Sequence, residues 1–131
     1  MSKQLFLVDD DEIFRTAATV LLGLNLPEYE TVQFENGLSV YEKLIDLVET
    51  AELLPELLLL DINMPVMNGW ELLEELKSAP AQIRQKVNIQ ILTSSIAPED
   101  LNLSKTYEFI NGYVTKPLTT SDIENLKNTL S

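Results

Sequence analysis

The fold is decided by the stretch at positions 57–69, Leu57-Leu58-Leu59-Leu60-Asp61-Ile62-Asn63-Met64-Pro65-Val66-Met67-Asn68-Gly69. A short run of leucines that ends at an acid is typical of a strand buried on both faces, as in parallel sheets. A helix is expected after Asn68-Gly69, because Asn68 is a favoured N-cap residue and Glu71 follows three positions later. The stretch therefore predicts a buried strand, a loop and a helix, with a carboxylate where the strand ends.

The same alternation of strand and helix patterns extends over the rest of the chain. Further strands are expected at 5–8, 29–34, 87–92 and 109–114. Apolar residues recur at helical spacing at Ile13, Ala17, Val20, Leu21 and Leu24, at Leu38, Tyr41, Leu44, Ile45 and Val48, at Trp70, Leu73 and Leu76, and at Ile123, Leu126 and Leu130. A less regular helix is expected after Pro98. Five β–α pairs predict an α/β fold with right-handed crossovers and a parallel sheet covered on both faces.

Reactive side chains stand where four of the expected strands end. Asp9-Asp10-Asp11 follows the first strand, Asp61 the third, Thr93-Ser94-Ser95 the fourth and Lys116-Pro117 the fifth. Ligands of open parallel sheets bind at the carboxyl ends of the strands. We therefore expect acids, a hydroxyl and an amine to meet at one rim of the sheet.

The chemistry of this rim points to phosphoryl transfer. Three neighbouring carboxylates raise one another's pKa, and a hard cation with oxygen ligands, most commonly Mg²⁺, removes that conflict. Beside such a cation Asp61 is suited to act as a nucleophile, because carboxylates form aspartyl phosphates. The Lys116 ammonium and the Thr93 hydroxyl would stabilise the phosphoryl oxygens. Each residue alone also has a structural explanation as a cap, a turn or a surface charge; their coincidence at one rim favours the functional one.

Composition excludes several other classes of protein. The chain has no cysteine and no histidine, so disulfides, thiolate or imidazole zinc sites and histidine acid–base catalysis are absent. Its four glycines, Gly23, Gly37, Gly69 and Gly112, form neither a dinucleotide-binding nor a P-loop motif. A net charge of −12 predicts no binding to nucleic acid or to anionic membranes. No apolar run approaches the roughly 20 residues that a membrane span needs, and we expect a cytoplasmic protein.

Four motifs in order resemble the receiver domains of two-component response regulators, over essentially the whole chain. They are the acidic motif Leu7-Val8-Asp9-Asp10-Asp11-Glu12, the phosphorylation motif at 59–69, the hydroxyl motif Ile91-Leu92-Thr93-Ser94 and the lysine motif Gly112-Tyr113-Val114-Thr115-Lys116-Pro117. The resemblance implies a doubly wound, flavodoxin-like (βα)5 fold with strand order 2-1-3-4-5. It also implies one receiver domain at 1–131, like a single-domain chemotaxis regulator, without an output domain.

The resemblance assigns a role to each rim residue. Asp61 would accept the phosphoryl group, while Asp9, Asp10, Asp61 and the backbone carbonyl of Asn63 would bind Mg²⁺ or Mn²⁺. Thr93 and Lys116 would hold the phosphoryl oxygens, and Thr93 and Tyr113 would form the conformational switch. The Lys116–Pro117 peptide is expected to be cis. Asn63 and Ser95 would set the rate of hydrolysis.

The resemblance also implies partners. The donor would be a histidine kinase or a histidine phosphotransfer protein, and a downstream protein would bind the face formed by the fourth helix, fifth strand and fifth helix. Homodimerisation is a further option. Such a module is not an enzyme in the usual sense, because it catalyses only its own phosphorylation and dephosphorylation.

Three alternatives remain open at this point. A pseudo-receiver would act as a protein-binding scaffold without phosphorylation, although such proteins usually lack part of the acid, threonine and lysine set. A phosphotransfer hydrolase would need a second acid two residues after Asp61, where this chain has Asn63. A flavodoxin-like cofactor binder is disfavoured, because the acidic rim would repel a flavin phosphate.

Overall fold

A computed structural model describes residues 3–94 and 97–130. In these ranges the chain forms five strands and six helices in alternating order. The strands are β1 (Lys3–Val8), β2 (Tyr29–Phe34), β3 (Leu57–Asp61), β4 (Asn88–Thr93) and β5 (Ile110–Thr115). The helices are α1 (Glu12–Asn25), α2 (Gly37–Glu49), α3 (Gly69–Lys77), α4 (Ala81–Lys86), α5 (Pro98–Ser104) and α6 (Thr120–Lys127).

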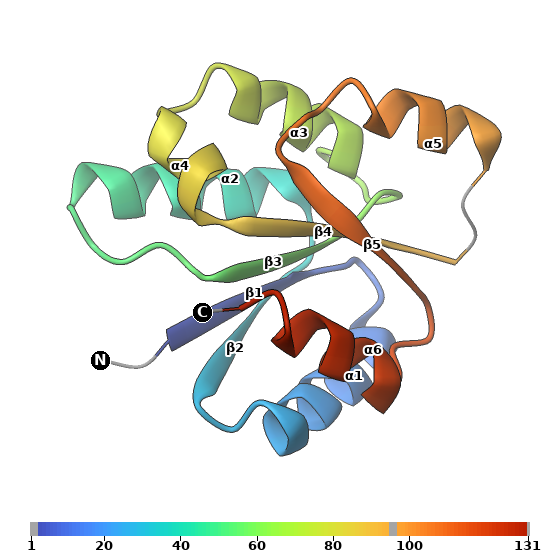
Figure 1. Cartoon of the computed structure of the whole chain (residues 1–131). Helices are drawn as coiled ribbons and strands as arrows, with labels where there is room; N and C mark the ends of the chain where they lie inside the picture. Colours follow the sequence, from blue (N-terminus) through green and yellow to red (C-terminus); the bar gives the residue numbers. More distant parts are fainter. Residues whose placement is uncertain (1–2, 95–96, 131) are drawn as a thin grey trace.

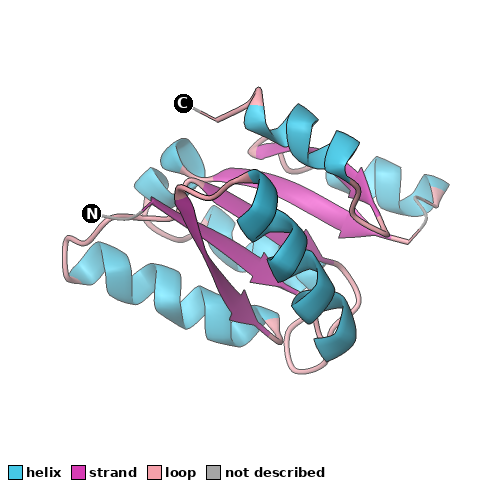
Figure 2. Ribbon diagram, turned by 90° about the horizontal axis from the view of Figure 1, so that it is seen from below, coloured by secondary structure: helices cyan, strands magenta, loops and turns pink. Residues whose placement is uncertain are grey.

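All five strands form one parallel sheet in the order β2-β1-β3-β4-β5, which confirms the predicted fold. Helices α1 and α6 cover one face of the sheet, and α2, α3, α4 and α5 cover the other (Figures 1 and 2). Strand β3 lies in the middle and all five of its residues are buried, as a strand covered on both faces requires. The strand order places β1 and β3, and therefore the acids that end them, side by side.

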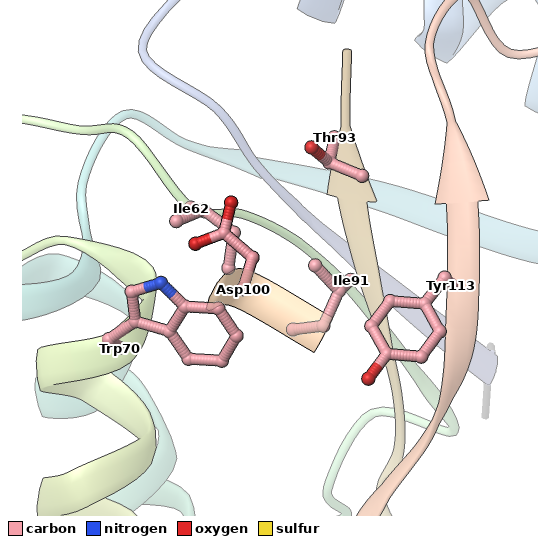
Figure 3. A pocket seen from close by; sticks show the side chains of 6 residues that line it. All are labelled: Ile62, Trp70, Ile91, Thr93, Asp100 and Tyr113. Carbon is pink, nitrogen blue, oxygen red and sulfur yellow. The ribbon is translucent and has the colours of Figure 1, made fainter. Parts of the chain in front are cut away.

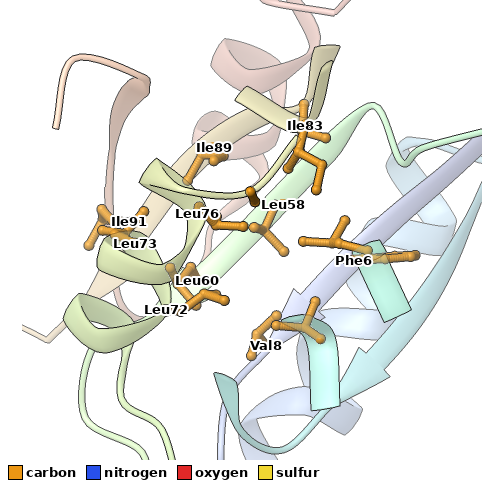
Figure 4. Packing of buried hydrophobic residues seen from close by; sticks show 14 of the residues in the cluster. Phe6, Val8, Leu58, Leu60, Leu72, Leu73, Leu76, Ile83, Ile89 and Ile91 are labelled. Atoms are coloured by element: carbon orange, nitrogen blue, oxygen red, sulfur yellow. The ribbon is translucent and has the colours of Figure 1, made fainter. Parts of the chain in front are cut away.

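The sheet separates two hydrophobic clusters, because successive side chains of a strand point to opposite faces. The larger cluster lies between the sheet and α2, α3 and α4, where Phe6, Leu58 and Ile89 pack against residues such as Leu73 and Ile83 (Figure 4). The smaller one lies against α1 and α6 and includes the alternate strand residues Leu5, Leu7, Leu57, Leu59 and Leu92. Burial on both sides fixes the register of the central strands and hence the positions of their carboxyl ends.

Two helices begin with capping boxes, of which the sequence predicts the one at Asn68. The Asn68 side chain accepts a hydrogen bond from the Glu71 amide at 2.9 Å, and the Glu71 carboxylate accepts one from the Asn68 amide at 3.0 Å. The same reciprocal arrangement joins Thr119 and Asp122 at the start of α6. The first of these capping boxes confirms the predicted start of α3.

The structure corrects the prediction of five helices. A short additional helix, α4, lies between α3 and β4, so the predicted fourth and fifth helices are α5 and α6. Pro80 precedes α4, and Ile83 is its buried residue. A single buried side chain on a six-residue helix gives too weak a periodic signal for recognition from the sequence.

A second correction concerns the face that α1 turns to the sheet. Ile13, Val20 and Leu24, which the helical spacing selected as the apolar stripe, are 82%, 60% and 76% exposed. The buried residues are instead Ala18 and Leu22. This helix carries two apolar stripes with the same period, and packing against the sheet, rather than periodicity, decides which one is buried.

Strand and loop boundaries differ slightly from the predicted ones. Both β4 and β5 begin and end one residue later than expected, and β1 begins two residues earlier. The segment between α2 and β3 is a loop at 50–56. Within the described residues, no helix is long and apolar enough to span a bilayer.

Candidate functional site

Three carboxylates meet at the carboxyl ends of β1 and β3, as predicted. Asp9 follows β1 and is fully buried, Asp61 ends β3 and is 5% exposed, and Asp10 faces solvent. One carboxylate oxygen from each residue lies within 4.8 Å of those of the other two. Hard divalent cations prefer such a set of oxygen donors. The three residues therefore fit the metal site that the sequence predicts.

The predicted lysine lies among these acids. The Lys116 ammonium is 2.5 Å from Oδ2 of Asp9 and 3.4 Å from Oδ1 of Asp61, and the side chain is 17% exposed. The backbone N–H of Lys116 donates to the carbonyl of Thr93 at 2.8 Å, which ties the lysine loop to the end of β4. The Lys116–Pro117 peptide is cis, as the resemblance predicts.

Burial and charge shift the ionisation of the central pair. Burial and the negative charge of Asp9 raise the pKa of Asp61 to about 6, although Lys116 acts in the opposite direction. Burial lowers the pKa of Lys116, but hydrogen bonds to Asp9 and Asp61 and the charges of both acids outweigh burial and raise it above its usual range. Lys116 is therefore a permanent cation at neutral pH, and Asp61 is a carboxylate whose charge is only partly compensated.

Two glycines allow the loop after β3 to approach its neighbours closely. A Cβ atom on Gly69 would lie 2.7 Å from the carbonyl oxygen of Asp61, and one on Gly37 would lie 2.7 Å from that of Met67. The backbone amides of both glycines donate hydrogen bonds across these contacts, Gly69 to Ile62 at 2.8 Å and Gly37 to Met67 at 2.9 Å. The glycines thus hold the Asp61 loop against the start of α3 and α2.

The loop that carries Asp9 is fixed by neighbours that the sequence analysis did not single out. Nη1 of Arg15 donates to the carbonyl of Asp9 at 2.7 Å, and its Nε donates to Gln33 on β2 at 3.1 Å. Oδ1 of Asp9 also accepts a hydrogen bond from the amide of Asp11 at 2.9 Å. Arg15 belongs to no sequence motif. It positions the Asp9 loop only because the fold brings β2 beside it.

Asp11, directly before α1, is the N-cap of this helix. Its side chain caps α1 by accepting hydrogen bonds from the amides of Ile13 at 3.0 Å and Phe14 at 3.3 Å. The ring of Phe14, a second residue that the sequence analysis missed, lies 4.7 Å from the Lys116 ammonium. Only the fold brings this first turn of α1 beside the loop after β5.

The two predicted switch residues line one hollow beside the site. Thr93 and Tyr113 border it together with Trp70, and Ile62, Ile91 and Asp100 complete its lining (Figure 3). The Tyr113 hydroxyl donates a hydrogen bond to Oγ of Ser104 at the end of α5. Thr93 on β4 and Tyr113 on β5 therefore border the same hollow, and Tyr113 is hydrogen-bonded to helix α5, a contact that the sequence motifs did not indicate.

The other predicted site residues lie in the loops around this rim. Asn63 follows Asp61 by two residues and its side chain is exposed. Ser95, to which the resemblance gave a part in hydrolysis, lies outside the described residues.

Comparison with known proteins assigns the chain to a family. The response regulator receiver domain matches residues 5–128. The chain belongs to this family. It is 31% identical over 118 residues to the chemotaxis protein CheY of Halobacterium salinarum, an alignment that covers 89% of this receiver and 87% of CheY.

Solved structures agree with the assignment. A two-component response regulator from Cytophaga hutchinsonii superimposes with a TM-score of 0.86 at 29% identity, covering 98% of this receiver and 96% of that chain. The Mn²⁺-bound form of response regulator Rcp1 superimposes with a TM-score of 0.72 at 25% identity, covering 95% of this receiver and 88% of that chain. This receiver spans only 44% and 50% of the length of two other curated relatives, both regulatory proteins. Receiver domains are signalling modules, and this chain carries the acidic pocket that fits phosphorylation.

Proposed function

We propose that this receiver accepts a phosphoryl group on Asp61 in a reaction that depends on Mg²⁺ or Mn²⁺, with a histidine kinase or a histidine phosphotransfer protein as the donor. One observation carries the proposal. One carboxylate oxygen from each of three acids lies within 4.8 Å of the other two, and the Lys116 ammonium lies 2.5 Å from Asp9 and 3.4 Å from Asp61. A structural salt bridge needs one acid for one base, whereas two buried acids and an exposed third beside a single lysine suit a cation and a phosphoryl group.

Asp9, Asp10, Asp61 and the backbone carbonyl of Asn63 would hold the metal. When bound, the cation supplies positive charge that offsets the charge of the three acids and stabilises that of a transferring phosphoryl group. The Mn²⁺-bound structure of the related response regulator Rcp1 supports the binding of a divalent cation by this fold. Because Lys116 pairs with Asp9 at 2.5 Å, a cation must compete with the ammonium for this carboxylate.

Three residues of this chain would then carry out the transfer. An oxygen of Asp61 attacks phosphorus, and the new P–O bond replaces the P–N bond to the histidine of the donor. The Lys116 ammonium compensates the charge of the phosphoryl oxygens, and the Thr93 hydroxyl donates a hydrogen bond to one of them. Histidine leaves as the free imidazole after it takes up a proton.

The surface beside the rim suits a protein donor. Ile13, Val20 and Leu24 form an exposed apolar stripe along α1, which begins directly after the acids Asp10 and Asp11. Solvent-exposed apolar residues aligned on one helix mark a contact surface for another protein. A donor helix placed along this stripe would bring its histidine to the open end of the site.

Output would pass through α5, β5 and α6. Thr93 and Tyr113 share a hollow, and Tyr113 is hydrogen-bonded to Ser104 in α5. Movement of Thr93 toward a phosphoryl group would open space for the Tyr113 ring and release this bond. Phosphorylation would thus shift the population between two arrangements of α5, which a downstream protein or a second copy of the chain could read.

The test is labelling by acetyl phosphate, followed by intact-protein mass spectrometry with and without Mg²⁺. We expect one phosphoryl group on the wild type only when the metal is present, none on Asp61→Asn, and full labelling of Asp46→Asn, a matched change on the exposed side of α2. Labelling of Asp61→Asn at the wild-type level would refute the assignment. Absence of both labelling and Mg²⁺ binding in the wild type would support the pseudo-receiver alternative.

A further inference from the structure

Three contacts hold the Lys116 ammonium. Two are ionic, to Asp9 at 2.5 Å and to Asp61 at 3.4 Å. The third is the face of the Phe14 ring, whose centroid lies 4.7 Å from Nζ, within the range of a cation–π interaction. Such contacts gain strength where water is excluded, and the lysine side chain is 17% exposed.

The proposed reaction changes both ionic contacts. Asp9 is needed as a metal ligand, and the carboxylate charge of Asp61 gives way to that of phosphoryl oxygens when an acyl phosphate forms. Phe14 takes no part in either step, so the reaction itself does not remove its contact with the ammonium. A lysine side chain is a flexible four-carbon stem. A contact that the reaction does not remove, such as the one with the Phe14 ring, keeps the ammonium from turning into solvent.

The position of the ring is itself fixed to the acidic loop. Asp11 caps α1 through the amides of Ile13 and Phe14, and the amide of Asp11 donates to Asp9 at 2.9 Å. The Phe14 side chain is half-buried against the hydrophobic cluster between the sheet and α1 and α6. One short segment therefore carries both the acid and the aromatic ring that contact Lys116.

We propose that Phe14 is a positioning residue for phosphoryl transfer, whose ring holds the Lys116 ammonium beside Asp61 through a cation–π contact. This inference rests on the proposed function for its effect on rate, but the contact itself is a property of the protein without metal or phosphoryl group. The two parts can therefore be tested separately.

The contact is tested by NMR of the metal-free protein. The Cε protons of Lys116, next to Nζ, lie near the ring face and should resonate upfield of the Cε protons of exposed lysines such as Lys43 and Lys105. We expect this displacement to disappear in Phe14→Leu and to remain in Phe109→Leu, a matched change at a half-buried phenylalanine that packs on the opposite face of the sheet. An ordinary Lys116 resonance in the wild type would overturn the inference.

The effect on rate is tested by replacing Phe14 with phenylalanines that carry one, two and three ring fluorines. Fluorine preserves the packing of the ring but withdraws the negative charge from its face. We expect the initial rate of labelling by acetyl phosphate and Mg²⁺ to fall stepwise along the series and about fivefold in Phe14→Leu, the factor that a cation–π contact of ordinary strength corresponds to. Unfolding temperatures should not follow the fluorine count.

The outcomes separate this inference from the proposed function. Equal rates across the fluorinated series, with or without a loss in Phe14→Leu, would overturn the positioning role while leaving phosphorylation of Asp61 intact. A wild type that shows the NMR contact but accepts no phosphoryl group would contradict the proposed function. In that case the contact would be structural, and the positioning role would fall with it.

Discussion

Asp61 combines burial with a negative charge that Lys116 compensates only in part, and this combination has a cost in stability. Its pKa in the folded protein is about 6, against 3.8 for an ordinary aspartate. The folded state therefore binds more protons than the unfolded chain between these two values, so the contribution of Asp61 to stability falls as the pH rises through this window. In the proposed function, a cation and a phosphoryl group make use of this unfavourable charge.

We expect Asp61→Asn to stabilise the metal-free protein at pH 7 by about 2 kcal/mol, because the substitution removes this charge. At pH 3, below both pKa values, the same substitution should have little effect. Urea denaturation of both proteins at the two pH values measures the difference. A destabilised Asp61→Asn variant at pH 7 would show that the acid is net favourable, against the raised pKa.

Val66 is a second residue that departs from its preferred state. Its φ angle is +69°, a left-handed conformation that β-branched residues rarely adopt, and its side chain is 73% exposed. The residue lies in the tight turn in which the Met67 amide donates to the Pro65 carbonyl at 2.8 Å.

Asparagine adopts a positive φ angle more readily than valine does. We expect Val66→Asn to raise the free energy of unfolding by about 1 kcal/mol, as strain relief of this kind provides. Thermal or urea unfolding measures the change, with the exposed Val20→Asn as the control on a helix. A decrease in stability of Val66→Asn would show that the valine side chain contributes packing that outweighs its strain.

At the scale of an element, α1 shows how one helix serves the core and the surface together. Leu22 is 1% exposed and packs in the cluster between the sheet and α6, whereas Leu24, two residues later, is 76% exposed. The same substitution at both positions therefore separates the two faces.

We expect Leu22→Ala to lower the free energy of unfolding by about 3 kcal/mol, the usual cost of a cavity at a buried leucine. Leu24→Ala should change it by no more than about 0.5 kcal/mol. Urea denaturation compares the two variants. Similar losses at both positions would mean that Leu24 is covered, for example by a second copy of the chain, which a concentration series would reveal.

Helix α3 offers a reporter for the movement of its neighbours. Trp70, the single tryptophan of the chain, borders the hollow that Thr93 and Tyr113 line (Figure 3). It also stacks on Tyr107 with ring centroids 6.1 Å apart. Tyr107 also donates a hydrogen bond to Glu74 of α3 at 3.0 Å. These contacts join α3 to the segment before β5.

We expect phosphorylation to change the fluorescence of Trp70, because movement of Thr93 and Tyr113 alters the surroundings of the indole. Emission spectra before and after acetyl phosphate with Mg²⁺ measure this, and Asp61→Asn is the control that should not respond. Unchanged emission from a fully labelled protein would place the switch outside this hollow.

At the scale of the whole molecule, the sheet and its rim followed from the sequence because the signals were local and strong. The leucine run of β3 is buried along its whole length, and the acids, Thr93 and Lys116 stand directly at strand ends, where topology alone brings them together. Because the strands are parallel, their carboxyl ends lie at one rim, and the residues at those ends could be predicted to form one site.

What the sequence did not predict depends on contacts between distant segments. The buried side of α1 depends on which of two equally periodic stripes meets the sheet, and α4 depends on one buried residue, Ile83. Arg15 and Phe14 act through partners on β2 and after β5. No spacing along the chain encodes such contacts, so they required the structure.

The central claim is that Asp61, rather than Asp9 or Asp10, receives the phosphoryl group. Reduction of the labelled protein with borohydride converts an acyl phosphate to an alcohol, and peptide mass spectrometry then locates the altered residue. Asp9 is fully buried and paired with the Lys116 ammonium at 2.5 Å, whereas Asp61 ends the central strand 3.4 Å from that ammonium. We therefore expect the mark at position 61 alone, dependent on Mg²⁺ and lost when the acyl phosphate is hydrolysed before reduction. A mark on Asp9 or Asp10, or on several acids in proportion to their exposure, would contradict the account.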